Sequence, residues 1–236
     1  EAMEALNRHN ERLGKVINTL KEYNLYKETT LIVLGDHSAL DENKAIKINT
    51  LLMQENLIHT NKKGKLVSWK AYCKSCDGSA YIYLKDTNDK DTYEKIHTLL
   101  FTLLRNEDNG IEEILSGPEA EKMGADPNCA FMLEARKGFY FIESFEGDYI
   151  KQISSVDMKG ETKYTLATHG YSPRKPDYTT FFMAAGKGIN KGQLIPHMNL
   201  VDIGPTLAAM LGVTLGETDG KVIEAFIQPN TKGGRR

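Results

Sequence analysis

The sequence predicts an α/β fold in which helices cover both faces of a mainly parallel sheet, with an α+β subdomain inserted into it. Residues 31–34 are four consecutive apolar residues without alternation, which is typical of a strand buried on both faces. This strand lies between two stretches of helical character, and the order helix, strand, helix is the order of an α/β layer. The middle of the chain differs, because short strands there are separated by turns instead of helices.

Residues 1–60 are predicted to belong to the α/β core. Apolar residues at helical spacing over 3–20 predict an amphipathic first helix. The apolar strand follows it. A second helix is expected next, with Asp41 or Asn43 as its N-cap and apolar residues as far as Met53.

Residues 61–160 are predicted to form the inserted α+β subdomain. A long amphipathic helix is expected over 93–104, and short helical pieces over 109–115 and 117–123. The last two strands of the segment are expected to pair through a short turn at 136–138. The expected strands are residues 66–69, 80–84, 130–135 and 139–142.

Residues 161–228 are predicted to return to the α/β core. A mostly apolar strand is expected over 180–185, followed by a helix that begins near Val201 and stops at Gly212. Residues 229–236 are polar and rich in glycine, and we expect this tail to be disordered.

Composition and charge exclude some classes of partner. The 236 residues are 40% hydrophobic and 26% charged, which is ordinary for a globular protein. A formal net charge of −2 provides no basic field to bind a nucleic acid duplex. No apolar stretch approaches the roughly 20 residues that span a bilayer. Helical periodicity is already present at Glu1, so we expect the chain to be part of a longer protein, and its cellular compartment stays open.

The three cysteines do not form a disulfide framework. Cys73 and Cys76 have CxxC spacing, but no second CxxC or nearby histidine pair completes a zinc ribbon, and Cys129 lies far along the chain. We interpret Cys73 and Cys76 as two loop thiols without a special role. A metal site at this pair stays the alternative.

The most informative residues directly follow the first apolar strand. Asp36 and His37 stand side by side at its end, and ligands bind beyond the carboxyl ends of strands in open α/β sheets. A carboxylate and an imidazole suit a divalent cation, so the pair predicts a metal site. A simple turn is the alternative. His169, in a loop over 168–173, is a second candidate ligand, although a histidine in such a loop is usually only solvated.

The order of these motifs resembles the alkaline phosphatase superfamily, in its type I phosphodiesterase/nucleotide pyrophosphatase branch. Residues 31–37 resemble the apolar strand and Asp-His pair of the branch, and residues 168–171 resemble its late His-Gly-Tyr segment. The pattern of the branch ends with a strand, a helix and an Asp-Gly pair. These resemble residues 183–188, 201–207 and 219–220 of this chain, respectively. The resemblance spans most of this chain and covers the C-terminal portion of the family pattern.

The resemblance implies an alkaline-phosphatase-like fold and hydrolysis of phosphodiester or nucleotide pyrophosphate bonds in small substrates, with two divalent cations, usually zinc. Carried over by position, Asp36 and His37 would bind the cation that holds the nucleophile. His169 would bind the cation that activates the attacking water. Two cations a few Å apart stabilise both the entering and the leaving oxygen of an in-line displacement.

One departure from the family pattern limits what the chain can do alone. The family places its nucleophile and its three remaining metal ligands upstream of the helix that begins here at Glu1. The chain is therefore expected to be a C-terminal fragment without a catalytic nucleophile, inactive alone and holding at best part of the metal. It is also expected to expose a face that the missing half would cover, through which copies could self-associate.

Two alternatives stay open. The parent protein could perform another chemistry of the superfamily, as a phosphomonoesterase, phosphonate hydrolase, phosphoglycerate mutase or sulfatase, because the upstream half largely sets substrate choice. The chain could instead be a non-catalytic binding module. The natural substrate and the oligomeric state are not determined by the sequence.

Overall fold

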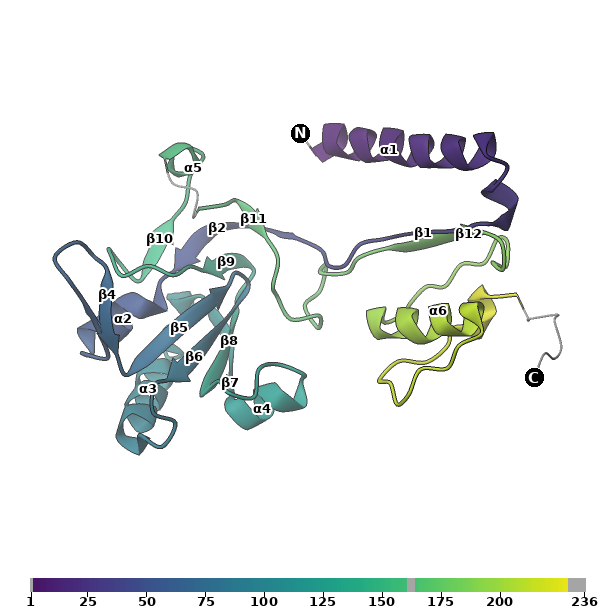
Figure 1. The fold of residues 1–236 in the computed structure, drawn as a ribbon. Helices are drawn as coiled ribbons and strands as arrows, with labels where there is room; N and C mark the ends of the chain where they lie inside the picture. Colours follow the sequence, from purple (N-terminus) through teal and green to yellow (C-terminus); the bar gives the residue numbers. More distant parts are fainter. Residues whose placement is uncertain (1, 161–163, 229–236) are drawn as a thin grey trace. The chain divides into compact units, whose positions relative to one another are not determined.

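The computed structural model describes residues 2–160 and 164–228 (Figure 1). Helices and strands are mixed along the chain, which confirms the predicted α/β class. The predicted tail, 229–236, lies outside the described residues. None of the helices in the described part of the chain has the length and apolar character that crossing a bilayer requires.

Packing divides the chain into two compact units. The first unit combines the chain up to Asp36 with the chain from Thr180 onward, and the second unit spans His37–Thr179. From the sequence we expected boundaries near residues 60 and 160. The second unit extends further in both directions because strands on either side of the middle segment pair with one another, as described below.

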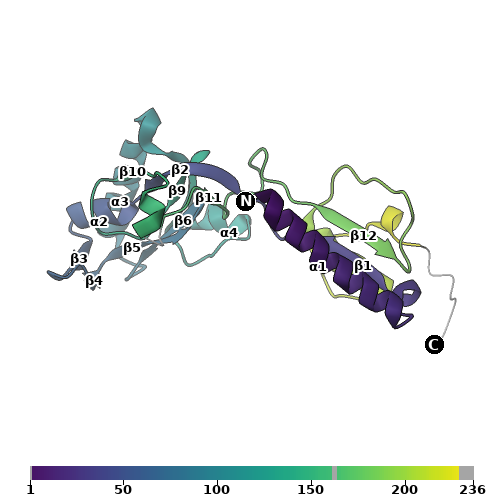
Figure 2. The same cartoon turned by 90° about the horizontal axis from the view of Figure 1, so that it is seen from above.

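The first unit is built on a two-stranded ribbon. Strands β1 (Thr30–Leu34) and β12 (Phe182–Gly186) pair antiparallel, with Val33 opposite Met183. In Figure 1, α1 and α6 lie on opposite sides of this ribbon, and Figure 2 shows α1 running beside it. The helices of the unit are α1 (Ala2–Glu22), η1 (Tyr26–Glu28), η3 (Leu200–Asp202), α6 (Ile203–Leu211) and η4 (Glu224–Phe226).

The first unit tests four of the sequence predictions. The first helix and the late strand are confirmed, and α6 ends at Gly212, whose φ of 70° is the left-handed conformation that glycine adopts easily. The prediction that residues 31–34 form a strand buried on both faces is wrong. No residue of β1 is buried, because β12 is its only partner among the described strands and the pairing is antiparallel.

The second unit contains a four-stranded antiparallel sheet in the order β5-β6-β8-β7. Ile82 of β6 and Leu133 of β8 are fully buried in it, and Ile96 and Leu100 of α3 belong to the same core. This sheet and its helices confirm the expected α+β character. The elements are β5 (Ala71–Cys76), β6 (Ser79–Leu84), α3 (Lys90–Leu103), η2 (Glu107–Asn109), β7 (Ile111–Ser116), α4 (Gly117–Lys122) and β8 (Phe131–Ala135).

Around β2 (Leu40–Ile46) the unit adds a second sheet. β9 (Gly138–Phe141) pairs with β2 in parallel, whereas β10 (Ile150–Gln152) and β11 (Ala167–Thr168) pair with it antiparallel. Parallel pairing is therefore limited to β2 and β9 within the described residues. The remaining elements are α2 (Ile48–Gln54), β3 (Ile58–Thr60), β4 (Leu66–Trp69) and α5 (Asp157–Gly160).

Tertiary pairing corrects three local predictions in this unit. The helix expected to begin at Asp41 or Asn43 begins only at Ile48, because the preceding residues form β2. The helical piece expected over 109–115 is largely strand β7, which pairs with β8. The expected hairpin through 136–138 does not form, because β8 pairs with β6 and β7 while β9 pairs with β2.

Candidate functional site

Asp36 and His37 follow β1 after Gly35; Asp36 belongs to the first unit and His37 to the second. The Gly35 N–H donates to the Phe181 carbonyl at 3.1 Å, which extends the β1–β12 pairing by one step. Both Asp36 and His37 are exposed. His37 Nδ1 lies 2.9 Å from the Ser38 carbonyl oxygen. Because a carbonyl only accepts, Nδ1 must donate, and Nε2 is then the nitrogen with the lone pair that a cation needs.

His169 directly follows β11, in a loop that rests on the β5–β6 turn. Its carbonyl accepts from the Gly78 N–H at 2.8 Å, and the Gly170 N–H donates to the Tyr178 hydroxyl at 2.8 Å. Gly170 has φ of 81°, and a Cβ there would lie 2.0 Å from the Cys76 carbonyl oxygen. Only glycine fits at this position, so the backbone beside His169 is held closely.

The second unit brings the two histidines together. The rings of His37 and His169 stack with their centroids 4.3 Å apart and an angle of 22° between their planes. Asp77 is near, with Oδ2 3.9 Å from His169 Nε2, which is beyond hydrogen-bond distance.

The stacked arrangement fits two cations better than one. Imidazole lone pairs lie in the ring plane, so the lone pairs of two nearly parallel rings run side by side and do not converge. In donor chemistry, the imidazoles of His37 and His169 suit a divalent cation. Within the described residues no group of three or more His, Cys, Asp or Glu side chains could hold a metal, so further ligands are needed.

The CxxC pair does not supply an alternative metal site. Cys73 and Cys76 lie in strand β5 and not in a loop, which corrects the sequence interpretation. Residues three apart in a strand point to opposite faces, and Cys73 is buried while Cys76 is exposed. Burial also raises the pKa of the Cys73 thiol, which disfavours the thiolate that a metal binds.

A buried polar network behind the His169 loop was not predicted from the sequence. The Tyr171 hydroxyl lies 2.9 Å from Glu42 Oε2 and 2.7 Å from the Phe139 carbonyl oxygen. Glu42 is 4% exposed, and burial raises its pKa from 4.5 to about 7. No sequence signal marks Glu42, which stands in a polar stretch.

A second buried polar group contains a lysine. Lys175 Nζ lies 3.0 Å from Glu134 and 2.6 Å from Glu112, and the Ser172 N–H donates to Glu134 at 2.9 Å. The side chains of Lys175 and Glu134 are each 5% exposed. Glu134 did carry a sequence signal, because it is a carboxylate inside the otherwise apolar stretch 131–135.

Comparison with known proteins identifies the family of the chain. The family model of type I phosphodiesterase / nucleotide pyrophosphatase matches residues 1–172. The chain belongs to this family. The match includes Asp36, His37 and His169. A comparison with curated proteins found no significant match.

Solved structures of the same family share the fold. Human ectonucleotide pyrophosphatase / phosphodiesterase 5 is 16% identical, with a TM-score of 0.66 over 92% of this chain and 50% of its own. The murine protein is 17% identical, with a TM-score of 0.63 over 93% of this chain and 51% of its own. An inactive variant of the murine protein, in complex with AMP, is 18% identical with a TM-score of 0.62, over 91% of this chain and 49% of its own. The chain therefore spans about half the length of these relatives.

Proposed function

We propose that this chain is the C-terminal half of a metal-dependent hydrolase that cleaves phosphodiester or nucleotide pyrophosphate bonds in small, nucleotide-like substrates. The stacking of His37 on His169 carries the proposal, because it joins the two motifs on which the family resemblance rests. Membership of the type I phosphodiesterase / nucleotide pyrophosphatase family supports the reaction class. The AMP complex of the murine relative supports a nucleotide as the substrate class.

In this proposal Asp36 and His37 bind one divalent cation, and His169 binds the other. The cations, which we propose to be zinc, would neutralise phosphate charge during an in-line displacement. The Nδ1–H of His37 donates to the Ser38 carbonyl, which orients the ring and directs Nε2 toward its cation. The exposure of Asp36, His37 and His169 leaves them accessible to a substrate.

We further propose that the chain alone is inactive. Its described residues contain no group of three metal-binding side chains, and it spans half of each related structure. The nucleophile and the remaining ligands would then come from the half of the fold that the chain does not span. Without them, a phosphate would lack both covalent capture and a complete metal site.

The experiment uses the longer protein that contains this chain. Hydrolysis of a chromogenic phosphodiester and of a nucleotide pyrophosphate is measured with zinc, alongside a phosphomonoester and a sulfate ester. Asp36→Ala, His37→Ala and His169→Ala should each lower kcat/KM by at least about 100-fold, because a ligand is lost. His59→Ala, at an exposed histidine of β3, is the matched control and should keep full activity. Normal turnover in all three ligand variants would refute the proposal. A preference for the phosphomonoester or the sulfate ester would show that the proposed substrate class is wrong.

The isolated chain offers a second test. We expect no turnover and fewer than two bound zinc ions per chain. Turnover by the isolated chain would contradict the proposed division of the active site. Zinc that remains after substitution of Asp36, His37 and His169, but is lost on substitution of Cys73 and Cys76, would favour the non-catalytic binding module.

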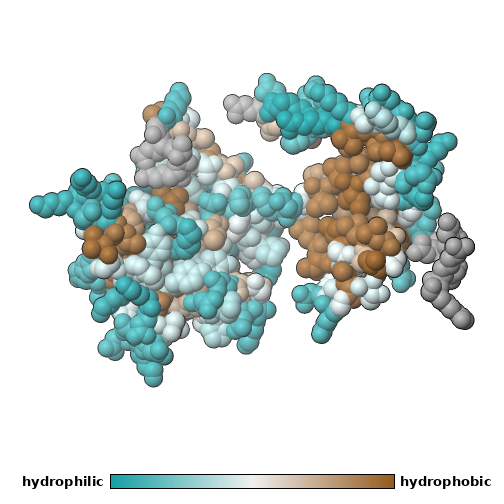
Figure 3. Space-filling model, viewed as in Figure 1, coloured by the Kyte–Doolittle hydropathy of each residue, from teal (hydrophilic) through white to brown (hydrophobic). Residues whose placement is uncertain are grey.

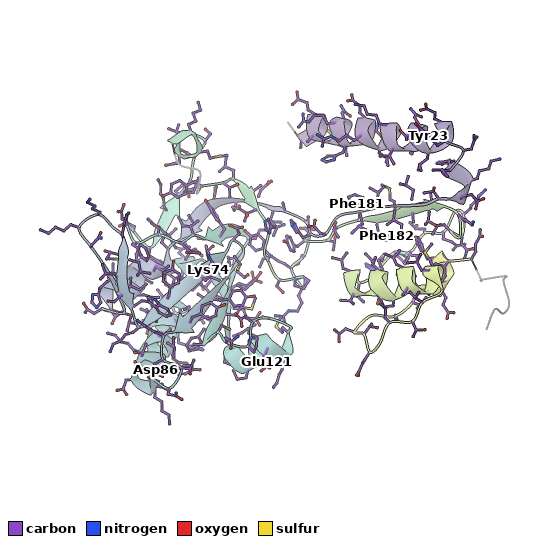
Figure 4. All side chains as sticks on the ribbon, in the orientation of Figure 1. Tyr23, Lys74, Asp86, Glu121, Phe181 and Phe182 are labelled. Carbon is purple, nitrogen blue, oxygen red and sulfur yellow. The ribbon has the colours of Figure 1, made fainter. Side chains whose placement is uncertain are left out.

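We also propose that the isolated chain self-associates through the apolar surface of its first unit. Figure 3 shows apolar residues gathered over this unit, and Figure 4 places Phe181 and Phe182 on its ribbon. Phe181 is 52% exposed and Met183 55% exposed, whereas Phe182 packs on Phe226 with ring centroids 5.0 Å apart. Light scattering should report a mass that rises with concentration, and Phe181→Lys with Met183→Lys should restore the monomer. A wild-type chain that stays monomeric would refute self-association.

A further inference from the structure

The candidate ligand His169 is exposed, yet the backbone that carries it is anchored by buried residues. Its side chain is 53% exposed. Tyr171, two residues further on, is 5% exposed and belongs to the main core of the second unit. The side chain of Tyr171 is therefore the nearest buried anchor that follows His169 in the chain.

Both the ring and the hydroxyl of Tyr171 are fixed. A Cβ at Gly78 would lie 2.4 Å from the Tyr171 ring, so the ring lies directly against the backbone of the β5–β6 turn. The same Gly78 donates its N–H to the His169 carbonyl. The turn, the ring and the ligand-bearing backbone thus form one packed unit, in which movement of the Tyr171 ring would move His169.

The hydrogen bonds of Tyr171 indicate where the protons are. The hydroxyl has one hydrogen but lies within hydrogen-bond distance of two oxygens, the Phe139 carbonyl at 2.7 Å and Glu42 Oε2 at 2.9 Å. The carbonyl can only accept, so the hydroxyl hydrogen satisfies Phe139. The contact with Glu42 is then a hydrogen bond only if Glu42 carries a proton and donates it to the tyrosine oxygen. Burial of Glu42, which raises its pKa, agrees with a neutral acid there.

We propose that Tyr171, bonded to a protonated Glu42, is a positioning residue that holds the His169 imidazole against His37. The catalytic meaning of this position rests on the proposed metal-dependent function, but the position itself does not. Without the hydroxyl, the Phe139 carbonyl and the Glu42 carboxyl lose their common partner. The loop can then shift on the β5–β6 turn, and the two imidazoles separate.

The test measures the histidine rings in the isolated chain without metal. Two-dimensional NMR of the imidazole protons, recorded just below pH 7, reports the upfield ring-current shift that stacked rings impose on each other. Tyr171→Phe keeps the ring against Gly78 and removes only the hydroxyl. We expect the His37 and His169 protons to lose their upfield shift in this variant.

Tyr149→Phe is the matched control. The Tyr149 hydroxyl donates to the Asn109 carbonyl at 2.8 Å, so the substitution removes one hydrogen bond of the same kind elsewhere in the unit. It should leave the histidine shifts unchanged. Unchanged histidine shifts in Tyr171→Phe would overturn the proposal, because the hydroxyl would then have no effect on the rings. An equal loss of the shifts in Tyr149→Phe would also overturn it, because the effect would then reflect a general loss of stability.

Two variants of Glu42 test whether its carboxyl group carries a proton. They also test the proposal if Tyr171→Phe fails to fold. Glu42→Gln retains a donor for the tyrosine oxygen and should preserve the stacked shifts, whereas Glu42→Ala should lose them. Equal behaviour of the two variants would overturn the role of Glu42. Since no metal is present, these outcomes are independent of whether the parent protein is a metal-dependent hydrolase.

Discussion

The imidazoles of His37 and His169 lie face to face, with ring centroids 4.3 Å apart, at opposite ends of the chain segment that forms the second unit. Neither residue belongs to the hydrophobic core. His37 precedes strand β2 and His169 follows strand β11, and these two strands pair antiparallel with Leu40 opposite Thr168, which brings the rings near each other. Their proximity is therefore a result of the fold and contributes little to its stability.

Removal of either imidazole should consequently cost little stability. We expect His37→Ala and His169→Ala to lower the free energy of unfolding by no more than about 0.5 kcal/mol, as for other exposed side chains. Urea unfolding of the isolated chain, without metal, measures this. A loss above about 2 kcal/mol in either variant would show that the histidines are structural residues instead of candidate ligands.

Gly170 should be far less tolerant of substitution than a glycine of similar conformation elsewhere. Gly170→Ala adds a Cβ that meets the Cys76 carbonyl oxygen at 2.0 Å and also strains a φ of 81°. Gly124 has φ of 80° with nothing within 4 Å of its Cβ position, so Gly124→Ala is a control that carries the strain alone. In urea unfolding we expect a loss of about 1 kcal/mol for the control and clearly more, about 3 kcal/mol, for Gly170→Ala. Equal losses would mean that the close approach to Cys76 is absent.

Lys175 should be needed for stability because it neutralises the buried carboxylate of Glu134. Lys175→Met leaves Glu134 buried without its cation, and we expect the free energy of unfolding to fall by about 3–5 kcal/mol. Lys137→Met breaks an exposed pair with Asp177, at 3.4 Å, and should cost less than about 1 kcal/mol. Chemical unfolding of both variants under the same conditions makes the comparison. A small effect of Lys175→Met would show that water reaches Glu134.

Glu42 should make stability fall as the pH rises toward neutrality. Its pKa is raised from 4.5 to about 7 in the folded chain, mainly by burial and with a smaller contribution from the negative charge of Asp77. Between these values the folded state binds more protons than the unfolded state, so the stabilising contribution is complete below 4.5 and is lost as the pH passes about 7.

The measurement compares unfolding free energies across this pH range for the wild-type chain and for Glu42→Gln, which cannot titrate. The difference between the two proteins isolates Glu42 from the other titrating groups. We expect the wild type to lose about 1–3 kcal/mol more than the variant between these two pH limits. Parallel curves would indicate that folding does not raise the pKa of Glu42, which would contradict the proton assigned to it.

Local structure was predictable where one periodicity dominated the sequence. Residues 80–84 and 93–104 are a strand and a helix as expected, because apolar side chains at the spacing of one element face the same core. The prediction was wrong for residues 111–115. Ile111 and Leu115 are spaced like residues on one helical face, but pairing with β8 makes this segment a strand.

The sequence by itself determined the family and the candidate ligands Asp36, His37 and His169, because these depend on residue order along the chain. Tertiary structure alone decided that His37 stacks on His169 and that Tyr171 meets Glu42. Contacts of this kind depend on which strands pair with one another and on which carboxyl groups are buried away from solvent. Neither property is encoded in the spacing of neighbouring residues, since both arise only when distant segments pack together.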